Sequence, residues 1–489
     1  MRKSGILLHP TSLPGEWGIG DLGQWAYRFA DFLAESGQQL WQILPLAPPG
    51  CGHSPYQAFS SVAGNPLLLS LQSLVQQGWL SPEDLQGIPS FPDSTVDFDA
   101  VIPSKLKLIK KAAASFFRQD THPLRHDFLE FCAQMKSWLD PYSEFAALKA
   151  ANQDLAWPDW NQKAGANNQD VLDQKFMQFE FFRQWKSLKG YCNGRGIEIV
   201  GDIPIFVAHD SADVWANPEL FDLDEQGNLR TIAGVPPDYF SKTGQRWGNP
   251  LYRWEVMEQS GYRWWVDRVK FTLEAVDIIR LDHFRGFEKY YEIPGSATTA
   301  VNGHWVQGPG NRLFEALQAS LGKVRFIAED LGYITPEVHA LRDQCGFPGM
   351  RVLQFAFGDQ SLENPHKPHN FIRNCVAYTG THDNDTTAGW FLRKAGPQAR
   401  SEIDMAFRYM GKERNNAAWD FIRLVLSSVA DTAIVPMQDV LGLGSEARMN
   451  IPSTVENNWH WRMREDQLSP GLAARLREMN LLYGRLRPY

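Results

Sequence analysis

Eight short apolar runs, each ending in polar, glycine or proline residues, constrain the fold of this chain more than any other feature. They lie at residues 5–14, 40–49, 197–207, 276–284, 324–332, 351–359, 375–383 and 432–440. Near-continuous apolar strands are typical of a parallel sheet that is buried on both faces. Helical patterns separate several of the runs, for example at 27–36, 262–275 and 310–322. Eight β-then-α units in series predict a (β/α)8 barrel.

The spacing of these runs is uneven, which predicts insertions on the barrel. The widest gap, between the second and third runs, contains helical patterns at 105–117, 126–139 and 173–188. We expect a single catalytic barrel domain over 1–489, a mostly helical subdomain at 50–190, an active-site loop region at 208–260 after the third strand, and a helical insertion at 385–430 after the seventh. A doubly wound open sheet is the alternative, but no GxGxxG follows the first run.

Charge and cysteine content exclude several classes of protein. The 489-residue chain has a net charge of -8 and a pI near 5.9, so it lacks the basic surface expected for binding nucleic acid or anionic membranes. No run approaches the roughly 18 apolar residues of a membrane span, and the apolar run before Pro10 is too short for a secretory signal. Five cysteines without CxxC spacing argue against a disulfide framework or a zinc site. We expect a cytoplasmic protein without a metal or other cofactor.

Aromatic residues are abundant, with 18 Trp, 14 Tyr and 29 Phe. Many lie beside glycine, proline or asparagine rather than inside periodic apolar segments; examples are Trp17, Tyr56, Tyr239, Trp247 and Trp459. They can be anchors of irregular loops. They can also be flat platforms for a ligand that is apolar on its faces and hydroxylated at its edge, as sugar rings are.

Polar residues end the predicted strands, where a barrel carries its catalytic groups. The third run contains Asp202 and is followed by His209 and Asp210, the fourth ends in Arg280, Asp282 and His283, the fifth ends in Glu329 and Asp330, and the seventh ends in His382 and Asp383. Any one carboxylate here can be the N-cap of the next helix, and Asp330 in particular reads so. Three carboxylates from separate strands, beside arginine and histidine, instead indicate a functional site.

Two neighbouring carboxylates suit glycoside chemistry, in which one attacks the anomeric carbon and the other protonates the leaving oxygen. Arg280 lies two residues before Asp282 on the same face of the strand, and we expect it to hold the pKa of Asp282 down. Glu329 follows the apolar residues FIA, so we expect burial to raise its pKa. These residues predict Asp282 as nucleophile and Glu329 as acid/base. Asp383 is left to bind sugar hydroxyls and favour the cationic transition state, with His382 and His283 as hydrogen-bond donors.

Several segments resemble known sequence regions. RLDHFRG, IAEDLG and GTHDNDT resemble regions of the α-amylase superfamily, and GDIPIFV resembles its region at the third strand, with Asp202 at the Asp position. More specifically, the chain resembles the 4-α-glucanotransferases called amylomaltases or disproportionating enzymes. The resemblance spans nearly the whole chain and rests on GILLHPTSLP, WQILPLAPPG, SPYQAFSSVAGNP, HDSADVWANP, GVPPDYFSKTGQRWGNPLY, RLDHFRGF, AEDLG, GTHDNDTT and MNIPSTVENNWHWR.

The resemblance implies a role for each matching position. Asp282, Glu329 and Asp383 match the nucleophile, the acid/base and the third carboxylate, and Arg280, His283 and His382 match their supporting residues. Tyr56 matches a donor-side aromatic residue. The stretch from Asp238 to Trp247 matches a flexible loop over the site, with Gln245 and Trp247 touching the glucan. Asn458 is expected among the substrate-binding residues.

The implied activity is transfer of a segment of an α-1,4-glucan to the 4-hydroxyl of a glucan or glucose acceptor. The mechanism would be a retaining double displacement, and ring closure to cycloamylose is also implied. The expected partners are α-1,4-glucans, and the expected state is a monomer or weak homodimer. An α-1,4-glucan hydrolase is the alternative within the same class. A non-catalytic glucan-binding protein is the alternative from another class, although the three carboxylates argue against it.

Overall fold

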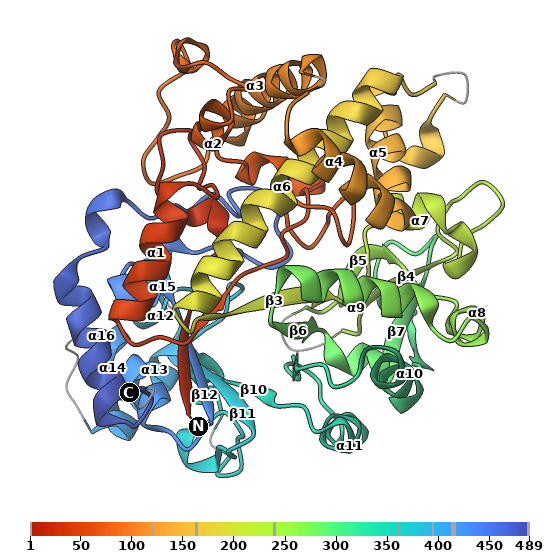
Figure 1. Ribbon diagram of the computed structural model, residues 1–489. Helices are drawn as coiled ribbons and strands as arrows, with labels where there is room; N and C mark the ends of the chain where they lie inside the picture. The colour runs from red at the N-terminus through yellow and green to blue at the C-terminus, as the bar shows by residue number, and fades with distance from the viewer. Residues whose placement is uncertain are drawn as a thin grey trace.

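The computed structural model describes residues 2–119, 121–161, 165–237, 241–359, 361–393, 396–411 and 417–486. Its centre is a closed barrel of eight parallel strands (Figure 1). In spatial order these are β1 (Lys3–Leu7), β2 (Leu40–Gln42), β3 (Glu198–Pro204), β6 (Ile278–Asp282), β9 (Phe326–Ala328), β10 (Gly349–Val352), β11 (Cys375–Tyr378) and β12 (Thr432–Pro436). Each predicted run contains or overlaps one of them, so the predicted (β/α)8 barrel is confirmed.

Helices surround the barrel because its strands are apolar on both faces and need a second apolar layer. The ring contains α1 (Gln24–Glu35), α6 (Asn168–Gly194), α9 (Arg263–Ala275), α10 (Asn311–Leu321), α11 (Pro336–Cys345), α14 (Ala417–Ser427) and α16 (Pro470–Leu482). Contacts run from α6 through α9 and α10 to α11 on one side, and from α6 through α1 and α16 to α14 on the other. One large cluster of buried apolar residues joins the strands to this ring.

The predicted helical insertion between β2 and β3 contains α2 (Leu71–Gln76), α3 (Phe98–Arg118), α4 (Leu124–Gln134) and α5 (Lys136–Ala151). Three of these, α3, α4 and α5, pack on the long helix α6, which leads back to the barrel. Figure 1 shows this group at one end of the molecule, while both termini lie towards the opposite end. The remaining helices are α13 (Pro397–Met410) and four short ones: α7 (Ala212–Ala216), α8 (Trp254–Gln259), α12 (Thr387–Leu392) and α15 (Met437–Leu441).

A second, antiparallel sheet was not among the sequence predictions. Its strands are β4 (Thr231–Val235), β5 (Gln245–Pro250), β7 (Lys289–Pro294) and β8 (His304–Gln307), in the order β5-β4-β7-β8. These strands have four to six residues, and only β5 (QRWGNP) combines glycine with proline, so none of them is long enough to show a clear period of two. The sheet follows β3 and β6 and therefore lies beside the carboxyl ends of the barrel strands.

Candidate active site

The end of β6 ties two carboxylates together. The strand finishes at Asp282, and His283 adopts a left-handed conformation with φ of 52°. The backbone N–H of His283 donates to Oε2 of Glu329 at 2.7 Å, and the N–H of Leu331 donates to Oε1 at 2.8 Å. Both oxygens of Glu329 are therefore fixed, one of them by the residue that directly follows Asp282.

Arg280 is shared between two carboxylates. Its Nη1 lies 3.0 Å from Oδ1 of Asp282 and 2.6 Å from Oδ2 of Asp202 on β3. Arg280 and Asp282 are two residues apart on one strand and point to the same face, as predicted from the alternation of a strand. The side chain of Asp202 is fully buried, whereas that of Asp282 is 28% exposed. One buried cation thus neutralises a structural carboxylate and orients a reactive one.

Burial dominates the ionisation of the pair. It raises the pKa of Asp282, with further increases from Asp202 and Asp383, and the charge of Arg280 opposes this rise without outweighing it. Burial, then the neighbouring charge of Asp282, raise the pKa of Glu329. The predicted increase for Glu329 is confirmed. Arg280 lowers the pKa of Asp282, as predicted, but burial outweighs this effect, so the pKa of Asp282 is raised overall. Arg280 is also shared with Asp202.

The opposite wall of the site comes from the end of β11. Tyr56 donates its hydroxyl to Oδ2 of Asp202 at 2.8 Å and stacks on His382 with ring centroids 5.0 Å apart. Nε2 of His382 lies 3.4 Å from Oδ1 of Asp383, and Trp459 packs against both aromatic rings. The side chain of Asp383 is 48% exposed. The structure therefore brings four of the predicted carboxylates to one mouth: Asp202, Asp282, Glu329 and Asp383.

Two residues that hold Asp383 were missed at the sequence level. Asn450 Nδ2 donates to Oδ1 of Asp383 at 2.6 Å, and Arg448 Nη2 donates to its backbone oxygen at 2.7 Å. Because more than sixty residues separate these partners, no local pattern could connect them. Asn458, which the sequence singles out, is buried. It accepts from Ile451 N and donates to the backbone oxygen of Thr454, so its described contacts lie within its own loop.

Trp247 reaches the site from the antiparallel sheet. Its ring lies edge-on to His283 with centroids 4.8 Å apart, and its Nε1 donates to Oε1 of Gln245 at 3.2 Å. Both residues belong to β5, which pairs with β4, so this part of the predicted flexible loop is a strand. Asp238 lies outside the described residues. Burial lowers the pKa of His283 to about 3, and its buried Nε2 has no partner within the described part of the chain.

Asp330 is not a helix cap, and this correction separates it from the neighbouring Glu329. Its carboxylate lies 2.5 Å from Arg342 Nη1 and 3.3 Å from Arg351 Nη1, and it accepts from Met350 N at 2.6 Å. The residue before α11 is Thr335. Any side chain at Gly349 would collide with the Asp330 carboxylate. Asp330 is therefore a buried structural ion pair behind the site.

The two polar residues after the third strand also lie apart from the site. Asp210 pairs with Lys149 of α5 at 2.6 Å, and Nε2 of His209 lies 2.8 Å from the backbone oxygen of Gly227.

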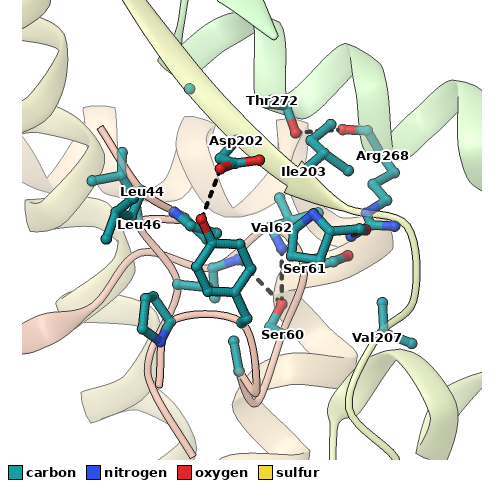
Figure 2. Close-up of a pocket in the computed structure, with 18 of the residues that line it drawn as sticks. Leu44, Leu46, Ser60, Ser61, Val62, Asp202, Ile203, Val207, Arg268 and Thr272 are labelled. Atoms are coloured by element: carbon teal, nitrogen blue, oxygen red, sulfur yellow. Dashed lines mark hydrogen bonds between the residues drawn. The ribbon is translucent and has the colours of Figure 1, made fainter. Parts of the chain in front are cut away.

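A cavity of about 70 Å³ lies between β3 and the segment from Ser60 to Val62. Figure 2 shows Asp202 and Arg268 on its walls, with the hydrogen bond to Asp202 drawn.

A sequence model described as 4-alpha-glucanotransferase matches residues 8–468 of this chain. The chain belongs to the 4-α-glucanotransferase family. The 4-alpha-glucanotransferase of Synechocystis is 49% identical over 99% of this chain and 98% of the relative, and that of Thermus thermophilus is 48% identical over 98% of each. The solved structure of an amylomaltase from Streptococcus agalactiae in complex with acarbose is 37% identical, covers 100% of both chains and superposes with a TM-score of 0.94.

A 4-α-glucanotransferase breaks one α-1,4 bond and makes another. The site offers the groups for that exchange: two adjoining carboxylates with raised pKa values and a third carboxylate that is open to solvent.

Among the described residues no three His, Cys, Asp or Glu side chains gather as a metal site. No helix in the described ranges is long and apolar enough to cross a membrane. All five cysteines are free thiols.

Proposed function

We propose that this 4-α-glucanotransferase works by a retaining double displacement through a glycosyl ester on Asp282. A carboxylate oxygen of Asp282 attacks C1 of the donor sugar, the C1–O4 bond to the leaving chain breaks, and Glu329 gives its proton to the departing oxygen. An acceptor 4-hydroxyl then attacks C1. The ester bond to Asp282 breaks, and the hydroxyl proton goes to Glu329.

The observation that carries this assignment is the hydrogen bond from His283 N to Glu329. It fixes the acid/base relative to the residue that follows the nucleophile, so neither carboxylate has to be repositioned during the reaction. The raised pKa of Glu329 supports the acid role, because a group that donates a proton must still hold it at working pH. Once Glu329 holds the proton, Asp282 beside Arg280 is the carboxylate left to ionise.

The surrounding residues are proposed to bind sugar and stabilise charge. Asp383 binds hydroxyls of the reacting ring and favours its cationic transition state, and His382 and His283 supply hydrogen bonds. The buried Nε2 of His283 has no hydrogen-bond partner among the described residues, which supports this role, because buried polar atoms are normally hydrogen-bonded and a sugar hydroxyl can supply the partner. Tyr56, held by Asp202, presents a flat face on the donor side, and Trp247 with Gln245 covers the glucan.

We propose α-1,4-glucans as both donor and acceptor, from maltooligosaccharides to longer chains. The acarbose complex of the similar amylomaltase supports oligosaccharide binding here. Transfer competes with hydrolysis of the same ester, so the enzyme must hold an acceptor in place and keep water out, and Trp247 over His283 is suited to this. Ring closure follows when the acceptor hydroxyl belongs to the donor chain itself.

The setting of the enzyme is also a proposal. Five free thiols support a reducing compartment, and we assign the protein to the cytoplasm as a monomer or weak homodimer. We further propose that the chain is one catalytic domain over 1–489, with the segments 50–190, 208–260 and 385–430 as insertions that border the site.

Trapping the glycosyl ester tests this mechanism directly. Glu329→Gln incubated with α-maltosyl fluoride should form the ester, because fluoride leaves without a proton, and should then resolve it slowly, because no base remains. Mass spectrometry of the intact protein should show a maltosyl adduct, and peptide mapping should place it on Asp282. The matched variant Glu329→Gln with Asp282→Asn should carry no adduct. An adduct on another residue would refute the assignment.

A further inference from the structure

Tyr333 is unusual among the aromatic residues of this chain. Among the described residues, the two aromatic side chains that are exposed are Tyr333, at 71%, and Phe355, at 42%. Both follow adjacent barrel strands, β9 and β10, so both lie at the end of the barrel that carries the site. A single exposed apolar residue needs no explanation, but Tyr333 does not stand alone.

Arg285 and Trp305 build a rigid support under Tyr333. The guanidinium carbon of Arg285 lies 3.7 Å from the ring centre of Trp305 and 5.5 Å from that of Tyr333. Its Nη1 donates to the backbone oxygen of Tyr333 at 2.5 Å. The rings of Trp305 and Tyr333 are 23° from parallel, with centroids 6.4 Å apart. Arg285 is itself 4% exposed, so the cation is held inside while the tyrosine ring faces outwards.

Two residues of this platform follow a reactive carboxylate closely along the chain, and the third lies on the antiparallel sheet beside the site. Arg285 lies three residues after Asp282, in the 3-10 turn Phe284–Phe287 that follows β6. Tyr333 lies four residues after Glu329, within about 14 Å along an extended chain. Trp305 is on β8, one edge of the antiparallel sheet, while the opposite edge, β5, carries Trp247. The sheet thus spans from the covered reaction centre to an open aromatic surface.

Resting on the proposed function, we propose that Arg285, Trp305 and Tyr333 form an acceptor-side binding site for α-1,4-glucan. Glu329 protonates the leaving oxygen, so the chain that leaves, and the acceptor that replaces it, occupy the side of the cleft on which Glu329 stands. The segment after Glu329 borders that side. A tyrosine ring with a cation behind it offers an apolar face and a hydroxyl edge, which match the face and edge of a glucose unit. The platform binds a sugar beyond the one that reacts.

A platform at this position should affect the binding of long acceptors but not that of glucose. Glucose fills only the place next to the reacting carbon, whereas maltotetraose extends along the cleft to the platform. Loss of the tyrosine ring should therefore weaken the binding of long acceptors and leave the binding of glucose unchanged. A stacked aromatic contact of this kind corresponds to about a three- to tenfold change in binding.

The experiment uses α-maltosyl fluoride as donor, because fluoride departs without occupying the acceptor side. Fluoride release reports ester formation, and transfer products report the acceptor. For Tyr333→Ala we expect unchanged fluoride release, an unchanged KM for glucose and a KM for maltotetraose raised about three- to tenfold. Tyr333→Phe keeps the ring and should stay within about twofold of wild type. Leu482→Ala, at a side chain that is 65% exposed on α16, is the matched surface control.

Three results would overturn the proposal. These are equal KM values for maltotetraose in wild type and Tyr333→Ala, an equal rise for glucose and maltotetraose, and a lowered thermal midpoint that accounts for the loss. Failure of the proposed function is distinguishable, because then the wild-type protein itself would release no fluoride or form no transfer product.

Discussion

The two walls of the site differ in how their carboxylates are held. On the wall formed by β3, β6 and β9, Asp202 is fully buried, Arg280 bridges it to Asp282, and both oxygens of Glu329 accept backbone hydrogen bonds. On the wall formed by β11, Asp383 is about half exposed and is oriented by Asn450 and His382. The carboxylates of the first wall have their protein partners in place before a sugar binds. On the second wall, the exposed part of Asp383 is left for the sugar to contact.

This difference indicates a division of labour. Groups that exchange protons or form bonds need fixed geometry and shifted pKa values, which burial supplies at a cost in folding free energy. A group that binds hydroxyls needs access, and its hydrogen bonds with water are replaced by those with sugar. Changes on the buried wall should therefore act on chemistry, and changes on the open wall should act mainly on binding.

The largest effect is expected for Asp282→Ala, which removes the nucleophile. We expect kcat to fall on the order of 10⁴-fold or more, with glucan binding retained, measured as glucose release from maltotriose and as binding by calorimetry. Asp330→Asn is the matched control on the same wall. It weakens a buried ion pair and should lower the thermal midpoint, while folded enzyme keeps its activity. Turnover of Asp282→Ala within tenfold of wild type would contradict the buried wall's role.

Glu329→Gln should have the next largest effect, about 10²- to 10⁴-fold on kcat with maltotriose. The loss should be much smaller for ester formation from α-maltosyl fluoride, which needs no proton. Because Glu329 must be protonated and its pKa is raised by burial and Asp282, wild-type activity should persist at neutral pH and fall as pH rises through that pKa. A profile that already declines near the pKa of an ordinary glutamic acid would show that the acid is not buried.

On the open wall, Asn450→Ala should lower kcat/KM about tenfold, or about 1.4 kcal/mol, because Asp383 loses an oriented hydrogen bond. The thermal midpoint should not change, since the pair faces solvent. Asn450→Asp should be worse, because two carboxylates would meet. Asn374→Ala is the control, because Asn374 directly precedes the first residue of β11, at the end of the strand away from Asp383. Its activity should match that of the wild type. A change in midpoint as large as the change in activity would remove the distinction between the two walls.

The smallest effect is a gain in stability. The pKa of Asp282 is higher in the folded chain than in the unfolded chain, so its ionisation destabilises the fold as pH rises from the unfolded value through the folded one. Asp282→Asn cannot ionise and should raise the thermal midpoint at pH 8, on the order of 1–2 °C, and by less at pH 4. Glu225→Gln, at an exposed side chain, is the surface control. A lowered midpoint at pH 8 would mean that pairing with Arg280 outweighs burial.

The barrel and the position of the carboxylates at the ends of its strands were predictable because each depends on local sequence. An apolar run such as 432–440 must be a buried strand, and a polar residue at its end must lie at the mouth. The antiparallel sheet was not predictable, because a strand such as KYYEIP gains its stability from partners distant in sequence. Asn450 was missed for the same reason.

Asp330 and Arg280 show a second limit. From the sequence, Asp330 is expected to be a helix N-cap. In the fold it instead forms ion pairs with Arg342 and Arg351, which come later in the chain. The sequence pairs Arg280 with Asp282, and the fold also pairs it with Asp202. The pKa of a carboxylate depends on how many other carboxylates share its arginine, and only the folded chain shows that number.

The most direct test of glucan transfer is to follow total reducing ends and free glucose together during incubation with purified maltotriose. We expect glucose and longer oligosaccharides to accumulate while total reducing ends stay constant, because each bond broken is replaced by one formed. A steady rise in reducing ends in step with glucose would contradict transfer and show that water resolves the Asp282 ester.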